Sequence, residues 1–122
     1  MILLTHETHI LLGVAPADFR RGIDGFVALC KNELSQNPRS GCVFVFINKA
    51  KTMIRALSYD GTGFWLMTKR LSRGKFTGWP TEKETVSATS ARELRIILKG
   101  TWSIAGSQVL ATKAYSATMK GV

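Results

Sequence analysis

Three apolar runs in the middle of the chain constrain its fold more than any other feature. Residues 42–47 form the first run, whose β-branched and aromatic side chains are typical of a strand buried on both faces. Residues 52–59 and 64–71 form the next two runs. Residues 60–63 lie between them and include two glycines that can take the positive φ of a tight turn. We therefore predict an antiparallel β-meander.

Segments on either side of the meander predict two further strands and two helices. Residues 10–13 and 85–88 are short apolar runs that favour a first strand and an edge strand. A single apolar stripe predicts one long amphipathic helix, which starts near Pro16 and ends before Asn37. The stripe consists of Phe19, Ile23, Phe26, Val27, Cys30 and Leu34. Residues 90–93 form a capping box, which predicts a shorter C-terminal helix ending at Gly100.

These elements predict one α+β domain. A chain of 122 residues has the length of a single domain. We place this domain at residues 1–102, with an antiparallel meander sheet, one long amphipathic helix and one shorter C-terminal helix. Residues 103–122 are rich in small and polar side chains, and we expect them to form a loosely ordered tail.

The charge balance favours a polyanionic partner. The chain has 17 Lys and Arg against 8 Asp and Glu, a net charge of +9. Such a surplus is typical of proteins that bind nucleic acid and, less often, an anionic membrane. A basic protein without a polyanionic partner is the alternative. No apolar segment has the roughly 20 residues needed to cross a bilayer, and the N-terminus lacks the features of a signal peptide, so we expect no membrane partner and a cytoplasmic location.

The basic residues are concentrated in and around the predicted meander. Residues 39–75 contain eight basic residues and one acidic residue, Asp60. Basic side chains on a sheet surface can neutralise phosphates and release counterions. Seven of them are our candidate nucleic-acid contacts, with the first four leading: Lys69, Arg70, Arg73, Lys75, Lys49, Lys51 and Arg55.

Aromatic residues alternate with basic ones over residues 73–80. The faces of Phe76 and Trp79 could accept stacked bases, as in surfaces that bind single strands. Large aromatic side chains in small sheet proteins are more often part of the core. We therefore favour a core position for both.

Two glycines within the predicted long helix need an explanation. Gly22 and Gly25 each cost about 1 kcal/mol relative to alanine inside a helix. Their presence indicates that another backbone or a ligand approaches closely there. Arg20 and Arg21 lie one turn from Asp24, and exposed ion pairs of this kind contribute little to stability.

The chain carries no recognisable metal, cofactor or catalytic motif. Cys30 and Cys42 lie far apart inside apolar runs, which favours two reduced core thiols. A metal-dependent nuclease using Asp18, Asp24 and Asp60 is the weakest hypothesis, because such chemistry needs several converging carboxylates. We explain Asp60 by its hairpin turn and Asp18 by a helix start. We expect no cofactor and no enzymatic activity.

An ordered series of motifs resembles one protein family. The motifs are VAPADFRRGIDGF at 14–26, NPRSG at 37–41, FVF at 44–46, YDGTGF at 59–64, KRLSRGKF at 69–76 and WP at 79–80. Their order and spacing, from about residue 13 to residue 102, are similar to those of the TnpB-type accessory proteins of the IS-sixty-six group of bacterial insertion sequences. The resemblance implies a role in transposition beside a larger transposase that cuts and joins DNA.

Two hypotheses for the partner remain open. In the first, the protein binds DNA, including the ends of its element, through the basic residues of the sheet. In the second, it docks on the transposase without contacting DNA, through the glycine-bearing helix. The residues of this candidate docking surface are Arg20, Arg21, Gly22, Asp24 and Gly25.

Overall fold

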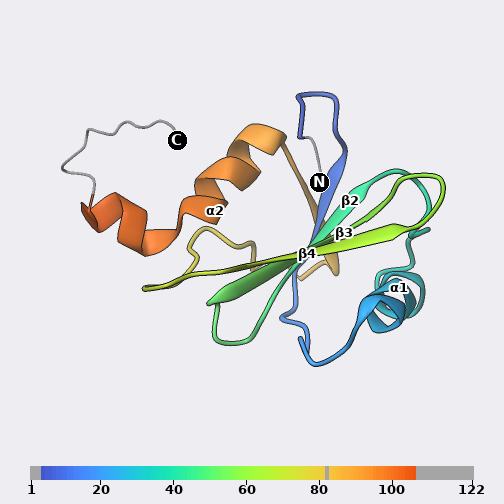
Figure 1. Ribbon diagram of the computed structural model, residues 1–122, viewed down its shortest axis with the longest axis horizontal. Coiled ribbons are helices and arrows are strands. Elements are labelled where there is room, and N and C mark those ends of the chain that lie inside the picture. Colours follow the sequence, from blue (N-terminus) through green and yellow to red (C-terminus); the bar gives the residue numbers. More distant parts are fainter. Residues whose placement is uncertain (1–3, 82, 107–122) are drawn as a thin grey trace.

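A five-stranded mixed sheet forms the centre of the molecule, with one helix on each side (Figure 1). The computed structural model describes residues 4–81 and 83–106. In chain order the elements are β1 (Ile10–Gly13), α1 (Ile23–Asn32), β2 (Val43–Ile47), β3 (Met53–Tyr59), β4 (Phe64–Arg70), β5 (Val86–Thr89) and α2 (Ala91–Gly106). The strands are arranged in the order β4-β3-β2-β1-β5. All five predicted strands are therefore present, within one residue of their expected bounds.

The meander is confirmed, but the sheet as a whole is not antiparallel. β3 pairs antiparallel with both β2 and β4, and β5 pairs antiparallel with β1 at the edge of the sheet. β1 and β2 pair in parallel, with Leu11 opposite Phe44. The cause is α1, which lies between them in sequence. Parallel neighbours need such a crossover connection, so strand–helix–strand here forms a βαβ unit.

β2 is buried on both faces, as its sequence predicts. Phe44 and Phe46 point to one side of the sheet and pack with Phe26 and Leu29 of α1. The rings of Phe26 and Phe46 lie 5.0 Å apart between centroids. The other β2 side chains point to the opposite side. Each face of the central strand thus contributes to a separate apolar core.

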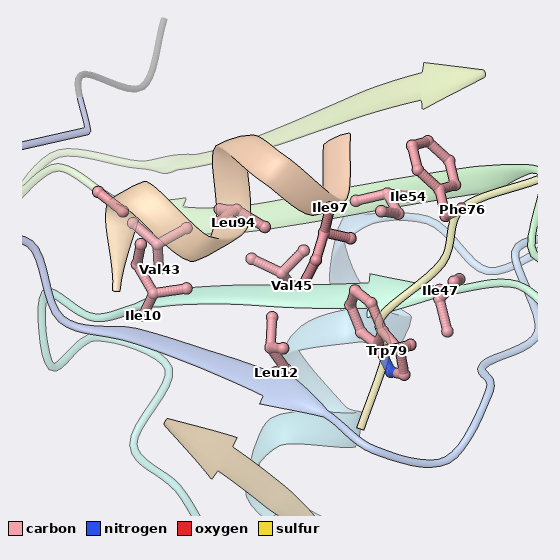
Figure 2. Close-up of a cluster of buried hydrophobic side chains, with 11 residues drawn as sticks. Ile10, Leu12, Val43, Val45, Ile47, Ile54, Phe76, Trp79, Leu94 and Ile97 are labelled. Atoms are coloured by element: carbon pink, nitrogen blue, oxygen red, sulfur yellow. The ribbon is translucent and has the colours of Figure 1, made fainter. Parts of the chain in front are cut away.

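The second core lies between the sheet and α2. Figure 2 shows Leu94 and Ile97 of α2 beside Val45 of β2, with Phe76 and Trp79 completing the cluster from the segment after β4. Phe76 and Trp79 are only 1% and 7% exposed, so their predicted core position is confirmed. The Trp79 Nε1–H also donates a hydrogen bond of 3.0 Å to the backbone carbonyl of Gly13. Neither ring offers a face to a partner.

α1 is shorter than the predicted helix and begins later. It spans ten residues, with Gly22 as its N-cap in an extended conformation. The preceding segment is instead held at the end of β2, since the amide of Ala17 donates to the carbonyl of Ile47 at 2.9 Å. Phe19 and Leu34 join the α1-side core from outside the helix. The apolar stripe therefore marks five residues that pack in this core, although it overstates the helix length and includes Ile23, which is 40% exposed.

α2 begins at the predicted capping box and is interrupted at the predicted end. The amide of Glu93 donates to the Ser90 hydroxyl at 3.0 Å, while a Glu93 carboxylate oxygen accepts from the Ser90 amide at 3.5 Å. Gly100 has a φ of 71°, which breaks the helix, and a second helical segment continues to Gly106. Residues 107–122, most of the predicted tail, lie outside the described residues.

Both cysteines are free thiols, as predicted. Cys30 is buried in the α1-side core, and this burial raises the pKa of its thiol to about 12. Cys42 is half-buried beside the same core. The two residues contribute packing, and Cys30 stays protonated at neutral pH.

Candidate nucleic-acid interface

Two loops at one end of the sheet carry much of the predicted basic surface. They are the β2–β3 turn and the segment that follows β4, and their basic residues are Lys49, Lys51, Arg73 and Lys75. Two backbone hydrogen bonds join the loops. The amide of Leu71 donates to the carbonyl of Thr52 at 3.0 Å, and the amide of Phe76 donates to the carbonyl of Lys51 at 2.8 Å. The fold thus brings residues about 20 positions apart into one surface.

The side chain of Asn48 and two backbone hydrogen bonds fix the β2–β3 turn. The Oδ1 atom of Asn48 accepts hydrogen bonds from the amides of Thr52 at 2.9 Å and Met53 at 3.0 Å. Lys51 is half-buried and has a φ of 63°, which is uncommon for a residue other than glycine. Lys49 is exposed. This anchoring presents the Lys49 side chain on an ordered turn.

A cationic cleft lies between the end of β4 and α2. Its volume is about 320 Å³, and Leu71 and Ser72 line it together with four basic residues. The four are Lys69, Arg70, Arg73 and Lys99. None of the described residues that line it is acidic. The Lys69 Nζ donates to the carbonyl of Leu98 at 2.7 Å, which links β4 to α2 just before the helix break. Three of the four leading sequence candidates therefore share one cleft.

Arg55 has a structural role in this fold. Its Nη1 donates to the carbonyls of Phe19 at 2.7 Å and Arg21 at 3.1 Å, and its Nε donates to the Thr68 hydroxyl at 2.8 Å. Its guanidinium also lies 4.9 Å from the centroid of the Phe19 ring. Arg55 holds the segment before α1 against the sheet, so most of its donors are already used.

The glycines of the candidate docking surface lie at the start of α1, Gly22 as its N-cap and Gly25 in its first turn. A Cβ at Gly22 would meet nothing within 4 Å, so this N-cap faces open space. A Cβ at Gly25 would lie 2.6 Å from the Cβ of Arg21, so the close approach at that position comes from the chain's own preceding turn. Asp24 lies in the first turn of α1 and is exposed. Among the described residues, no second backbone segment approaches either glycine, and the expectation of a ligand or partner there stays a prediction.

The two acidic residues with shifted pKa values are held by local hydrogen bonds. Asp18 precedes α1 rather than starting it, and its hydrogen bonds from Arg20, the shortest 2.7 Å, lower its pKa to about 2. Asp60 accepts hydrogen bonds from Thr62 and Gly63 in the hairpin turn and from Trp65 Nε1, and these hold its pKa far below the usual value. Within residues 4–81 and 83–106, no three His, Cys, Asp or Glu side chains gather as a metal site would require.

Two residues of this region were not among the sequence candidates. Lys99 enters the cationic cleft from α2. In the sequence it is marked only as the residue before Gly100, the predicted end of the helix. Trp65 is 47% exposed on β4, although an apolar strand run predicts burial. β4 lies at the edge of the sheet, and no local pattern in its apolar run predicts this exposure.

These features define a small, basic α+β domain with a cationic cleft beside its edge strand. Among the described residues, no helix combines the length and apolar character required to cross a membrane. The family described as "IS66 Orf2 like protein" matches residues 8–106, and the chain belongs to this family of insertion-sequence accessory proteins.

Two relatives come from Sinorhizobium fredii (strain NBRC 101917 / NGR234). The first, "Uncharacterized protein y4jC", is 37% identical over 100 residues, which cover 82% of this chain and 85% of the relative. The second, "Uncharacterized protein y4hO", is 31% identical over 94 residues, which cover 77% and 81%. No solved structure matches this chain. The relatives support the family and leave its biochemical activity to be inferred from the site.

Proposed function

We propose that this protein is a non-catalytic accessory protein of insertion-sequence transposition that binds DNA through its cationic cleft. The observation that supports this proposal is the cleft itself, where four basic residues from β4, the segment after it and α2 converge, and none of the described lining residues is acidic. Lys69, Arg70, Arg73 and Lys99 would contact phosphates. Lys49, Lys51 and Lys75 would extend the contact surface along the neighbouring loops.

The salt dependence of binding follows from the number of phosphates contacted. Each neutralised phosphate contributes about −0.9 to the slope of log affinity against log salt. Four contacts give a slope of about −3.6, which corresponds to a loss of about 150-fold between roughly 50 and 200 mM salt. Contacts from the neighbouring loops would make the slope steeper.

Fluorescence anisotropy with labelled duplexes tests the proposal. One duplex carries the terminal repeat of the element and the other a scrambled sequence, each at low and physiological salt. The variant Arg70→Ala/Arg73→Ala removes two positive charges and should reduce the magnitude of the salt slope by about 2. Lys31→Glu on α1 lowers the net charge equally from an exposed position and serves as the matched control. Equal effects of the two variants would refute a specific cleft.

Preference between the two duplexes defines the kind of DNA binding. Tighter binding to the terminal repeat would make the protein an end-recognition factor. Salt-steep binding without preference would make it a general DNA-coating helper. Absence of binding to both duplexes would reject the proposal in favour of transposase docking.

Docking on the transposase is the second candidate function. Exposed apolar area at the start of α1 supports it, since Ile23 is 40% exposed beside the open Gly22. Arg20, Arg21, Asp24 and Gly25 would complete this surface. Gly22→Trp/Ile23→Glu should abolish co-purification with the transposase while Lys31→Glu leaves it intact. Co-purification that survives the double variant would rule out this surface.

A further inference from the structure

Trp65 is an exposed aromatic side chain that is nevertheless held in place. It lies on the edge strand β4 and is 47% exposed. Its Nε1 donates a hydrogen bond of 2.8 Å to Oδ2 of Asp60. The other Asp60 oxygen accepts from the amides of Thr62 at 2.9 Å and Gly63 at 3.0 Å, so the acceptor is itself fixed. The indole is oriented by its polar edge while much of its surface remains open.

The register of β4 places Trp65 in line with the cationic cleft. Trp65, Met67 and Lys69 lie opposite Ser58, Ala56 and Ile54 of β3. Ile54 and Ala56 belong to the core on the α2 side, so the three β4 side chains point to that side of the sheet. At about 3.3 Å per residue, Trp65 and Lys69 are about 13 Å apart along the strand.

An apolar groove follows the middle of this line and reaches Lys69. It has a volume of about 230 Å³ and lies between α2 and the β3–β4 part of the sheet. Met67, Leu94 and Leu98 contribute to its walls, and Lys69 lines both this groove and the cationic cleft. An open aromatic ring, an apolar groove and a cluster of cations therefore follow one another along β4.

We propose that this surface binds an unpaired DNA strand, with a base stacked on Trp65 and the following backbone in the cationic cleft. The proposal rests on the proposed function in that it takes DNA as the partner. Proteins that bind single strands combine a basic groove with aromatic platforms, because an unpaired base exposes its π-face. In a duplex this face is covered by neighbouring pairs. The four cations at one end of the line favour a polyanion over an apolar protein segment as the occupant.

Binding of a labelled oligothymidylate of about 12 nucleotides, compared with a duplex of the same length, tests this site. Trp65→Leu and Trp65→Phe both remove the hydrogen bond to Asp60, but only Trp65→Phe retains an aromatic ring. Trp65→Leu should weaken single-strand binding by roughly 5- to 150-fold, the range expected for loss of one stacked base, while Trp65→Phe retains most of it. Neither variant should change duplex affinity by more than about twofold.

Ile96→Ala is the matched control, since Ile96 is another large apolar side chain that is exposed, at 57%, on α2. It should leave single-strand affinity unchanged. Circular dichroism of each variant verifies folding.

The outcomes separate this proposal from the function on which it rests. One outcome is that duplex binding depends steeply on salt while Trp65→Leu and wild type bind the single strand equally well. This outcome would overturn the stacking site and leave the DNA-binding function standing. Equal losses for both kinds of DNA, or equal losses for Trp65→Leu and Trp65→Phe, would likewise overturn it. Absence of binding to any DNA would overturn both proposals.

Discussion

Replacing Arg55 with methionine should destabilise the fold while leaving DNA binding by the folded protein intact. Methionine keeps an unbranched apolar stem and removes every hydrogen-bond donor. The lost donors include those that reach the carbonyls of Phe19 and Arg21. These bonds hold the segment before α1 on the sheet, so their loss should loosen the entry to the helix.

The size of the effect follows from the contacts of the guanidinium. A hydrogen bond from a charged donor contributes about 1.5–3 kcal/mol. Arg55 is half-buried, so in the variant water can partly replace its hydrogen bonds to the two carbonyls. The lower end of the range therefore applies, and the two bonds together contribute about 3 kcal/mol. Its position over the Phe19 ring adds about 0.5–1 kcal/mol, part of which the methionine stem recovers. We expect a loss of about 3 kcal/mol from a total stability of about 5–15 kcal/mol.

Urea unfolding followed by circular dichroism measures this change, and Arg70→Met provides the control. Both substitutions remove the same atoms and charge, but Arg70 is exposed at the end of β4. Arg70→Met should alter stability by less than about 0.5 kcal/mol and should weaken DNA binding. The reasoning would be refuted if Arg55→Met had nearly wild-type stability and lost DNA affinity as Arg70→Met does.

Three further predictions concern the turns and the core. Gly100→Ala should lower the free energy of unfolding in urea by about 1–3 kcal/mol, because Gly100 has a φ of 71° and an added Cβ would lie 2.8 Å from Leu71. The control Gly63→Ala, which has open space around the added Cβ, should lower it by less than about 0.5 kcal/mol. The pKa of Asp60 is lower in the folded state, so its stabilising contribution is present above about pH 4 and is lost on acidification; Asp60→Asn should show a smaller fall in urea midpoint between pH 7 and pH 3. The thiol of Cys30, whose pKa is raised to about 12, should react with a thiol reagent at pH 8 only after unfolding, and rapid reaction in the native protein would contradict its burial.

Elements that depend on neighbouring residues could be predicted from the sequence. The capping box at 90–93 and the turn at 60–63 are closed by side chains within three residues of each other, so their chemistry can be read directly. The continuous apolar run of β2 likewise predicts burial on two faces. The parallel pairing of β1 with β2 depends on a long-range connection. The order strand, helix, strand in the sequence was the signal for this parallel pairing. The antiparallel meander formed by the later strands obscured that signal.

The site was predictable as a charge pattern but not as a geometry. Lys69, Arg70 and Arg73 are close in sequence, so their convergence needed only the end of one strand. Arg55 carries the same charge and lies in the same basic stretch, yet its bonds to residues more than 30 positions earlier give it a different role. Lys99 joins the cleft because α2 packs against the sheet, and no local pattern predicts that position. Long-range contacts therefore decide which cations remain available to a ligand.

The position of β1 has a consequence for how the domain folds and opens. This four-residue strand lies between β2 and β5, and Leu12 is opposite both Val45 and Ser87. Closing these pairings requires long loops to lose their freedom, and such contacts slow folding. Once closed, β1 cannot leave the sheet without breaking both ladders. Its amide protons should therefore be among the slowest in the domain to exchange with solvent, and their exchange should report global rather than local unfolding.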